Sequence, residues 1–288
     1  MKILIIGANG QLGSDIVRVL DSRQVIPLTH KDIEIADKDC VQKIITSYNT
    51  GIVINTAAYH NVKECEKDDI KSFKINALGA KNLATICKKR DIILVHISTD
   101  YVFDGKKRKP YIESDSPCPL NVYGLTKLAG EYYIRYIWPK HFIIRTSGLY
   151  GLSKCRAKGG NFIDLMLKLA KEKDEIQVVG DEILTPTYTL DLAQKIKDVI
   201  KTEYFGLYHI TNNGFCSWYE FAREIFKFSG LKVNLKRTTV KEFGGEVKRP
   251  PYSVLKNHNL EKLGMDDMRD WKEALKDFLS VRLRRANR

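Results

Sequence analysis

The sequence predicts an α/β fold: a doubly wound parallel Rossmann sheet with a smaller C-terminal substrate-binding α/β subdomain. Three observations support this. Short apolar runs rich in β-branched residues alternate with longer segments of helical period. A glycine turn begins at residue 7, directly after the first apolar run. The 288 residues, 43% hydrophobic and 29% charged, are enough for one large α/β domain with an appendage.

Five strands are expected in the first half of the chain, with helices between them. The segment 72–90 carries apolar residues at three- and four-residue intervals and is expected to be a helix. Residues 151–160 are rich in Gly and Lys, which is typical of a flexible loop, and a further helix is expected over 217–230. The expected strands are KILIIG (2–7), QVIPL (24–28), IVIN (52–55), IILVHIS (92–98) and FIIRTS (142–147).

The strand and helix rhythm weakens after residue 147, which suggests a division near residue 150. We expect residues 1–150 to form an NAD(P)-binding Rossmann domain. Residues 151–288 are expected to be mainly substrate-binding, with a segment at about 176–203 returning to the Rossmann domain. The first apolar run is too short for a signal peptide and no run is long enough to span a bilayer, so we expect a cytoplasmic protein without membrane contact.

The charge pattern argues against a nucleic-acid-binding protein, and the cysteine pattern argues against a zinc- or disulfide-based one. The formal net charge is +13, but most lysines are spread among acidic residues, as on solvated helix faces. Dense basic runs occur only at 106–109 and 282–288, so no nucleic-acid partner is expected, although the positive field would attract an anionic nucleotide-sugar. The six cysteines form no CxxC pair and have no His at zinc-ligand spacing, which indicates reduced thiols.

The glycine turn GANGQLG (7–13) has the features of a pyrophosphate site. Glycines allow a tight turn and a close approach of the backbone, and the N-terminus of the following helix faces the negative charge. The second strand runs into Thr29, His30 and Lys31, without the acidic residue that binds an adenosine 2′-hydroxyl. This favours NADP(H), with His30 or Lys31 as the phosphate contact. Asp32 and Glu34 follow closely and leave NAD(H) open.

Tyr123 and Lys127 form a candidate acid/base pair. Four residues apart on a helix, they share one face, and a lysine cation lowers the pKa of a neighbouring phenol towards working pH. The same spacing recurs four times elsewhere, so the spacing alone decides nothing. Only Tyr123/Lys127 opens a long helical pattern, and it follows the strand 92–98. The end of that strand brings Ser98, Thr99 and Asp100 to the carboxyl edge of the sheet, where ligands of such sheets bind.

Taken together, eight segments resemble the dTDP-4-dehydrorhamnose reductase family of extended short-chain dehydrogenase/reductases. This resemblance implies NAD(P)H-dependent reduction of a 4-keto nucleotide-sugar, with dTDP-4-dehydro-L-rhamnose reduced to dTDP-L-rhamnose. The segments are GANGQLG (7–13), NTAAY (55–59), STDYVFDG (98–105), PLNVYGLTKLAGE (119–131), RTSGLYG (145–151), PTYTLDLA (186–193), GLYHITN (206–212) and RPPYSVL (249–255).

The resemblance also implies roles for particular residues. Tyr123 is then the general acid, Lys127 holds Tyr123 and the nicotinamide ribose, and Thr99 hydrogen-bonds the keto oxygen. Cofactor-binding residues besides Tyr123 and Lys127 are expected to be Gly7, Gly10, Gln11, Leu12, Gly13, His30, Lys31, Glu34, Ile35, Ala57, Ala58, Tyr59 and Asn76. Substrate-binding residues are expected to be Thr99, Asp100, Tyr101, Gly148, Asn161 and Arg249.

Two features depart from the family pattern. Gly148 stands where better-known bacterial reductases have a Trp that packs on the sugar, so a wider and less discriminating sugar pocket is expected. The glutamates of the family's metal-linked dimers have no counterpart nearer than Asp15. No structural metal is therefore expected, and a homodimer is left open.

Two alternative functions stay open. One is a non-catalytic, NADP-binding regulatory subunit of the same fold, although retention of Thr99, Tyr123 and Lys127 argues against it. The other is a nucleotide-sugar epimerase or dehydratase. Dehydratases place an Asp-Glu pair after the threonine at the strand end, whereas here Thr99-Asp100 is followed by Tyr101.

Overall fold

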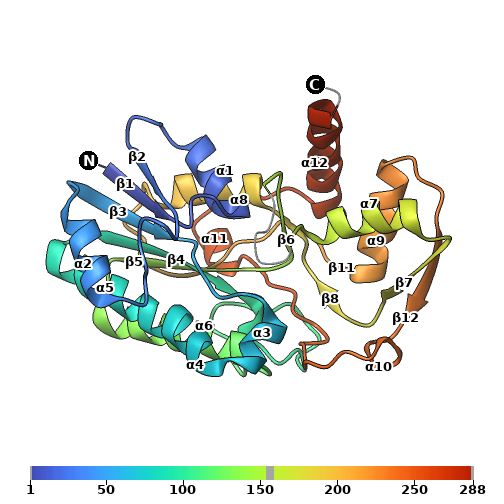
Figure 1. Ribbon diagram of the computed structural model, residues 1–288, viewed down its shortest axis with the longest axis horizontal. Coiled ribbons are helices and arrows are strands. Elements are labelled where there is room, and N and C mark those ends of the chain that lie inside the picture. The colour runs from blue at the N-terminus through green and yellow to red at the C-terminus, as the bar shows by residue number, and fades with distance from the viewer. Residues whose placement is uncertain (1, 154–158, 287–288) are drawn as a thin grey trace.

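The computed structural model describes residues 2–153 and 159–286, which form a larger and a smaller lobe side by side (Figure 1). The larger lobe is built on six parallel strands in the order β10-β5-β4-β3-β1-β2. The five strands predicted from the sequence are all present, with ends that differ by at most two residues. The strands are β1 (Lys2–Ile6), β2 (Val25–Leu28), β3 (Thr50–Asn55), β4 (Ile93–Thr99), β5 (His141–Thr146) and β10 (Gly206–His209).

Helices cover both faces of this sheet, and side chains of alternating strand residues feed two separate cores. On one face, α1 (Gln11–Val19), α8 (Thr189–Val199) and α11 (His258–Lys262) pack on residues such as Ile5 and Ile144. On the other face lie α2 (Lys38–Thr46), α5 (Gly79–Arg90) and α6 (Val122–Ile137). This confirms the doubly wound parallel sheet, because both faces of each central strand are buried.

The order of the strands locates the ligand crevice. The chain passes from β1 outwards to β2 and then returns to the other side of β1 as β3. Connections therefore diverge between β1 and β3, and ligands of open α/β sheets bind at such a point, beyond the carboxyl ends of the strands. Gly7 follows β1 and Thr56 follows β3.

The smaller lobe has its own apolar core, formed by residues between Tyr150 and Leu279. Two short sheets frame it: β7 (Glu175–Val179) pairs with β12 (Asn234–Thr238), and β8 (Ile183–Leu184) with β11 (Cys216–Ser217). A further pair, β6 (Leu149–Tyr150) and β9 (Thr187–Tyr188), lies close by. The helices are α7 (Phe162–Glu172), α9 (Trp218–Phe228), α10 (Val240–Phe243) and α12 (Trp271–Ala286), with α9 matching the helix expected over 217–230.

The lobes do not divide the chain at a single residue. Within the segment 176–203, α8 packs on α1 in the larger lobe, whereas the residues of β7 belong to the smaller one. Residues 206–209 and 258–262, which the sequence did not assign to the Rossmann half, also lie there as β10 and α11. The domain limits given above therefore stay a proposal.

The helix expected over 72–90 is not regular. It consists of α4 (Asp69–Phe73), a π-helical turn η1 (Lys74–Leu78) and α5. A Cβ on Gly130 of α6 would lie only 2.5 Å from the carbonyl oxygen of Asn76, so the turn and α6 are in very close contact. Apolar spacing cannot reveal this interruption, because a π turn shifts the register by one residue only. Of the loop expected over 151–160, residues 154–158 lie outside the described residues.

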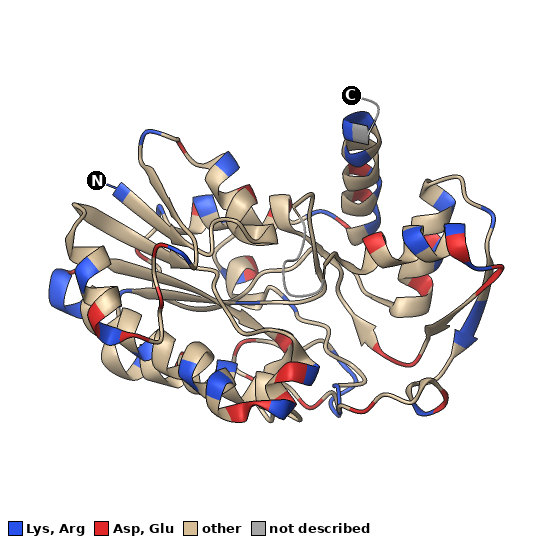
Figure 2. Cartoon of the chain, viewed as in Figure 1, with Lys and Arg blue, Asp and Glu red and all other residues tan. Residues whose placement is uncertain are grey.

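Two properties of the whole chain bear on its partners. Among the described residues, no helix is long and apolar enough to cross a membrane. Those residues also contain no group of three or more His, Cys, Asp or Glu side chains that would hold a metal ion. Figure 2 shows Lys and Arg on the helices of both lobes with Asp and Glu between them, rather than on one basic face.

Buried histidine makes the fold acid-sensitive. Burial, with the Arg145 guanidinium second, lowers the pKa of His209 to about 3. The unfolded chain takes up this proton near pH 6.5 and the native protein does not, so stability is lost as the pH falls from 6.5 towards 3. At pH 5 the loss amounts to about 2 kcal/mol. Thermal unfolding should show a smaller loss between pH 7 and pH 5 for His209→Gln than for the wild type, whereas His30→Gln, with its exposed side chain, should leave the loss unchanged.

Candidate active site

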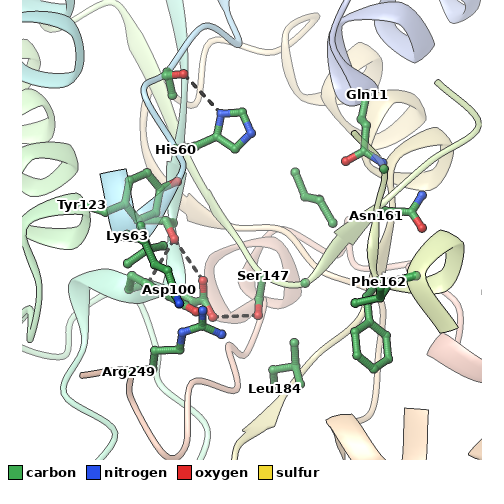
Figure 3. Close-up of a pocket in the computed structure, with 18 of the residues that line it drawn as sticks. Gln11, His60, Lys63, Asp100, Tyr123, Ser147, Asn161, Phe162, Leu184 and Arg249 are labelled. Carbon is green, nitrogen blue, oxygen red and sulfur yellow. Dashed lines mark hydrogen bonds between the residues drawn. The ribbon is translucent and has the colours of Figure 1, made fainter. Parts of the chain in front are cut away.

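A cavity of about 1580 Å³ lies at the carboxyl ends of the strands and is lined by residues of both lobes. Its volume exceeds that of a typical single-ligand pocket, so it has room for a dinucleotide and a second ligand together. Figure 3 shows Tyr123 and Asp100 on one wall, with Gln11, Asn161 and Phe162 across the opening.

The glycine turn forms a cradle that side chains would block. Gly7 has a φ of +80°, and its carbonyl oxygen accepts from the N–H of Gly10 at 2.9 Å. A Cβ on Gly13 would lie 2.2 Å from that same oxygen. Helix α1 begins at Gln11 without a side-chain cap, which leaves backbone N–H groups for an anion.

Gln11 adds a second indication of a missing ligand. Its Nε2 is buried and has no hydrogen-bond partner among the described residues. The side chain lines the cavity beside Gly7, Gly10, Leu12 and Gly13. An unpaired buried donor beside a helix N-terminus suits a phosphate oxygen. The residues at this end of the cavity therefore fit the pyrophosphate of a dinucleotide.

The end of β2 bears on the choice between NADPH and NADH. The Asp32 carboxylate accepts from the N–H and the hydroxyl of Thr29, both at 2.7 Å, and these bonds lower its pKa. Asp32 does not line the cavity; His30 and Glu34 do, and His30 Nδ1 lies 3.4 Å from Glu34 Oε2. Ile35 also lines it, whereas Lys31 does not.

We therefore expect NADPH to bind at least as tightly as NADH. Replacing His30 by Asp places a carboxylate where a 2′-phosphate would lie, so His30→Asp should weaken NADPH binding about tenfold or more and NADH binding little. Fluorescence titration measures both affinities. Gln42→Glu adds the same charge on exposed α2 and should change neither. A clear preference of the wild type for NADH would mean that Glu34 receives the ribose.

Asn76 fixes the segment after β3 from the side that faces away from the cavity. Ala57 and Ala58 line the cavity, but Tyr59 and Asn76 do not. The Asn76 amide accepts from the Tyr59 N–H and donates to the Tyr59 carbonyl, both at 2.9 Å, and also donates to Thr126 Oγ1 at 3.1 Å. Asn76 thus fixes the course of this segment rather than facing a ligand directly.

Thr99 and Tyr123 meet on the wall of the cavity. Thr99 ends β4 and Tyr123 lies in the first turn of α6, whose N-cap Asn121 accepts from the Gly124 N–H at 2.9 Å. Burial raises the pKa of Tyr123 above its usual value, and a hydrogen bond with Thr99 opposes this. Tyr123 therefore holds its proton in the ligand-free protein.

Lys127 does not act on Tyr123 in the way that the sequence predicted. Its Nζ donates to the Ile97 carbonyl at 2.6 Å and lies 3.0 Å from His96 Nε2. Burial, the largest cause, raises the pKa of Tyr123, so the net shift is opposite to the lowering that the sequence predicted. The lysine itself points towards β4 and not along its own helix face.

Polar side chains at the substrate end converge on Asp100. Its carboxylate accepts from the Thr99 hydroxyl at 3.0 Å and from Ser147 at 2.8 Å (Figure 3), and burial raises its pKa. The Tyr101 ring meets the Tyr123 ring edge-on, with centroids 5.9 Å apart. Arg249 lines the same region and points towards Asp100 and Ser147.

Asn161 and Gly148 also line the cavity, but each has a structural task. Asn161 caps α7 and donates to the Gly151 carbonyl at 3.1 Å. Gly148 has a φ of +56°, and a Cβ there would lie 2.8 Å from Leu184 Cδ1 and from the Thr185 carbonyl oxygen. Leu184 lies beside Gly148 and lines the cavity with it, and the wider sugar pocket stays a prediction.

Several cavity residues escaped the sequence reasoning. Phe162 and Trp218 offer ring surfaces, with centroids 4.6 Å apart, and Lys63 forms an ion pair with Glu246 across the opening at 3.1 Å. Glu182 is buried beside them, which raises its pKa. Each comes from a segment remote in sequence from the strand 92–98, so no local pattern indicated it.

Comparison with known proteins gives a consistent result. The RmlD substrate binding domain model matches residues 1–283. The chain is 42% identical to the spore coat polysaccharide biosynthesis protein SpsK of Bacillus subtilis (strain 168), over 98% of both chains. It is 36% identical to the dTDP-4-keto-6-deoxy-D-glucose reductase of Streptomyces niveus, over 94% of both. A crystal structure of the dTDP-4-dehydrorhamnose reductase of Bacillus anthracis in complex with NADP superposes with a TM-score of 0.93 at 39% identity, covering 98% of this chain and 100% of that one.

Proposed function

The chain belongs to the RmlD family, and from this premise we propose that it is an NADPH-dependent reductase of a 4-keto nucleotide-sugar. The substrate that the family favours is dTDP-4-dehydro-L-rhamnose, reduced to dTDP-L-rhamnose. The observation that carries this proposal is the shared cavity: the glycine cradle lies at one end, and Thr99 and Tyr123 lie on its wall.

The cofactor assignment is supported by the residues themselves and by the relative from Bacillus anthracis, which holds NADP. Gly7, Gly10 and Gly13 leave room for the pyrophosphate, and Gln11 supplies an unpaired donor. When bound, the nicotinamide supplies the hydride for the carbonyl carbon. NAD(H) remains the second candidate until both affinities are measured.

The protein supplies the proton and the alignment. Tyr123 carries a proton on its phenol because burial raises its pKa, so it can give that proton to the keto oxygen as the hydride arrives. Thr99 donates a hydrogen bond to the same oxygen once its hydroxyl turns from Asp100. One hydride and one proton then convert the ketone to an alcohol.

The other side chains bear on recognition of the substrate. The Arg249 guanidinium suits the diphosphate, because it forms bidentate bonds to phosphate oxygens. Phe162 and Trp218 offer surfaces for a flat base. Asp100, Tyr101 and Asn161 stay proposals as sugar contacts, with Leu184 as the apolar wall beside Gly148.

A turnover assay tests the proposal. Purified protein with NADPH and dTDP-4-dehydro-L-rhamnose should oxidise NADPH only when the sugar is present, and mass spectrometry should find a product heavier by two hydrogen atoms. Tight NADPH binding without any turnover would contradict the proposal and favour the regulatory subunit. Parallel assays with dTDP-4-keto-6-deoxy-D-glucose decide which sugar epimer is preferred. The homodimer and the cytoplasmic location stay predictions.

A further inference from the structure

A chain of hydrogen bonds connects β3 with the lysine of the proposed active site through a buried histidine. Asn55 ends β3, His96 lies in β4 and Lys127 in α6. Each of the three is only 1% exposed. The contacts are 3.1 Å between Asn55 Nδ2 and His96 Nδ1, and 3.0 Å between His96 Nε2 and Lys127 Nζ. Because these side chains are buried, each donor among the three has to find its acceptor within this group of hydrogen bonds.

The orientation of the Asn55 amide determines which ring nitrogen of His96, Nδ1 or Nε2, carries the proton. Asn55 Oδ1 accepts from the backbone N–H of Ala57 at 3.1 Å, and a backbone N–H only donates. The other end of the amide, facing His96, is therefore the NH2 group. His96 Nδ1 has to accept from it, so a neutral ring carries its proton on Nε2.

Lys127 consequently faces a donor. An ammonium group has no lone pair, so an ammonium at Lys127 would oppose its N–H to the N–H of His96. An amine has one lone pair, which accepts from His96 Nε2, and two protons, one of which goes to the Ile97 carbonyl at 2.6 Å. The amine therefore makes hydrogen bonds with both His96 Nε2 and the Ile97 carbonyl, whereas an ammonium would face the N–H of His96 with an N–H of its own.

We propose that His96 is a positioning residue that donates its Nε2 proton to Lys127 and thereby favours the neutral amine in the ligand-free protein. The place of this arrangement in the reaction rests on the proposed function, which puts Lys127 at the cofactor end of the reacting centre. In the ligand-free protein, above the pKa of Lys127, the site would hold a protonated phenol and an uncharged lysine.

Burial shifts the pKa of Lys127 in the direction that this assignment needs, so that the amine becomes the main form above about pH 8. Burial lowers the pKa of Lys127 to about 8, with the Glu131 carboxylate opposing. Glu131 lies on the same helix and is neutralised by Arg145 of β5, at 2.7 Å. Burial also lowers the pKa of His96 well below its usual value, followed by the effects of Lys127 and of His141 on β5. No carboxylate contacts His96 to stabilise its protonated form, among the described residues.

Nitrogen NMR of the wild-type protein reads the proton position directly. With 15N-labelled histidine and no ligand, we expect the His96 ring to be neutral with its proton on Nε2 at roughly pH 8.5 to 9.5, above the pKa of about 8 that burial gives Lys127. The His96 signals are identified by their loss in His96→Gln. A proton on Nδ1, or on both nitrogens, would overturn the inference, and the measurement itself is made on the wild-type protein.

Asn55→Asp tests the same hydrogen bonds, because it should reverse the donor and acceptor at each contact. The second carboxylate oxygen would demand a proton on His96 Nδ1, Nε2 would become an acceptor, and the Lys127 ammonium would be favoured. The pKa of Lys127, followed by the 13Cε shift of labelled lysine, should then rise by about one unit or more, equivalent to tenfold in the ionisation constant. An equal rise for Asn55→Asp in a His96→Phe background would show a bare charge effect and contradict the role of His96.

Both NMR measurements use the ligand-free protein, so they are separable from the turnover assay. If the wild type reduces no 4-keto sugar while His96 carries its proton on Nε2, the proposed function fails and the proton arrangement stands. If turnover occurs with the proton on Nδ1, the arrangement fails and the proposed function stands.

Discussion

Tyr123→Phe is expected to lower kcat by about 10²-fold or more while NADPH affinity changes little. The variant keeps the ring, and with it the edge contact to Tyr101, but loses the proton that the ketone oxygen receives. Losing one acid/base group has a typical cost of this size, and an effect on kcat without an effect on binding marks an interaction made in the transition state. Steady-state kinetics and a fluorescence titration of NADPH measure the two quantities.

Tyr132→Phe is the matched control for this prediction. Tyr132 lies on the same helix and its residue is 52% exposed, so removing its hydroxyl should leave kcat unchanged. Near wild-type turnover by Tyr123→Phe would contradict the assignment of the general acid. The proton would then have to come from another hydroxyl on that wall, such as Thr99 or Tyr101.

Gly13→Ala is expected to disrupt the cofactor cradle. The added Cβ would lie 2.2 Å from the Gly7 carbonyl oxygen and 2.8 Å from its carbonyl carbon, and both are backbone atoms that cannot turn aside. We expect a free energy of unfolding lower by about 1–3 kcal/mol, typical of overpacking. NADPH binding should weaken about tenfold or more, because the turn and the start of α1 have to move apart.

The sign of the stability change makes this test decisive. Helix propensity alone would make Gly13→Ala a stabilising change of about 1 kcal/mol, since position 13 lies inside α1. Gly245→Ala is the control, because its Cβ would make an ordinary contact of 3.6 Å with Val240. Calorimetry that finds Gly13→Ala more stable than the wild type, with NADPH affinity retained, would refute the close packing of the cradle.

Much of the candidate site could be proposed from the sequence because its signals are local in the chain. The turn from β1 into α1 needs glycine where the backbone doubles back, and the strand end at Thr99 follows from a run of buried β-branched residues. Tyr123 was selected over four other Tyr/Lys pairs because a long helical pattern starts beside it. Each of these inferences depends on residues within about twenty positions of one another.

Residue roles that depend on distant contacts could not be read in this way. Asn76 was expected to meet the cofactor, but its amide is occupied by the backbone of Tyr59. Gly148 was expected to widen the pocket, and the side chain that lies beside it, Leu184, comes from β8. In each case the partner lies 17 to 36 residues away and is brought close only by the fold.

Short stretches of sequence were enough to predict the parallel sheet and the glycine turn and to propose the Tyr123/Lys127 pair, because hydrophobic period and glycine placement act locally. The contacts of Lys127 follow from the fold. Helical spacing put Lys127 beside Tyr123, but its ammonium or amine takes the lowest-energy partners within reach, and these are His96 and the Ile97 carbonyl of β4. A buried polar group is governed by whichever donors and acceptors surround it, and those are set by packing between elements that are far apart in the chain.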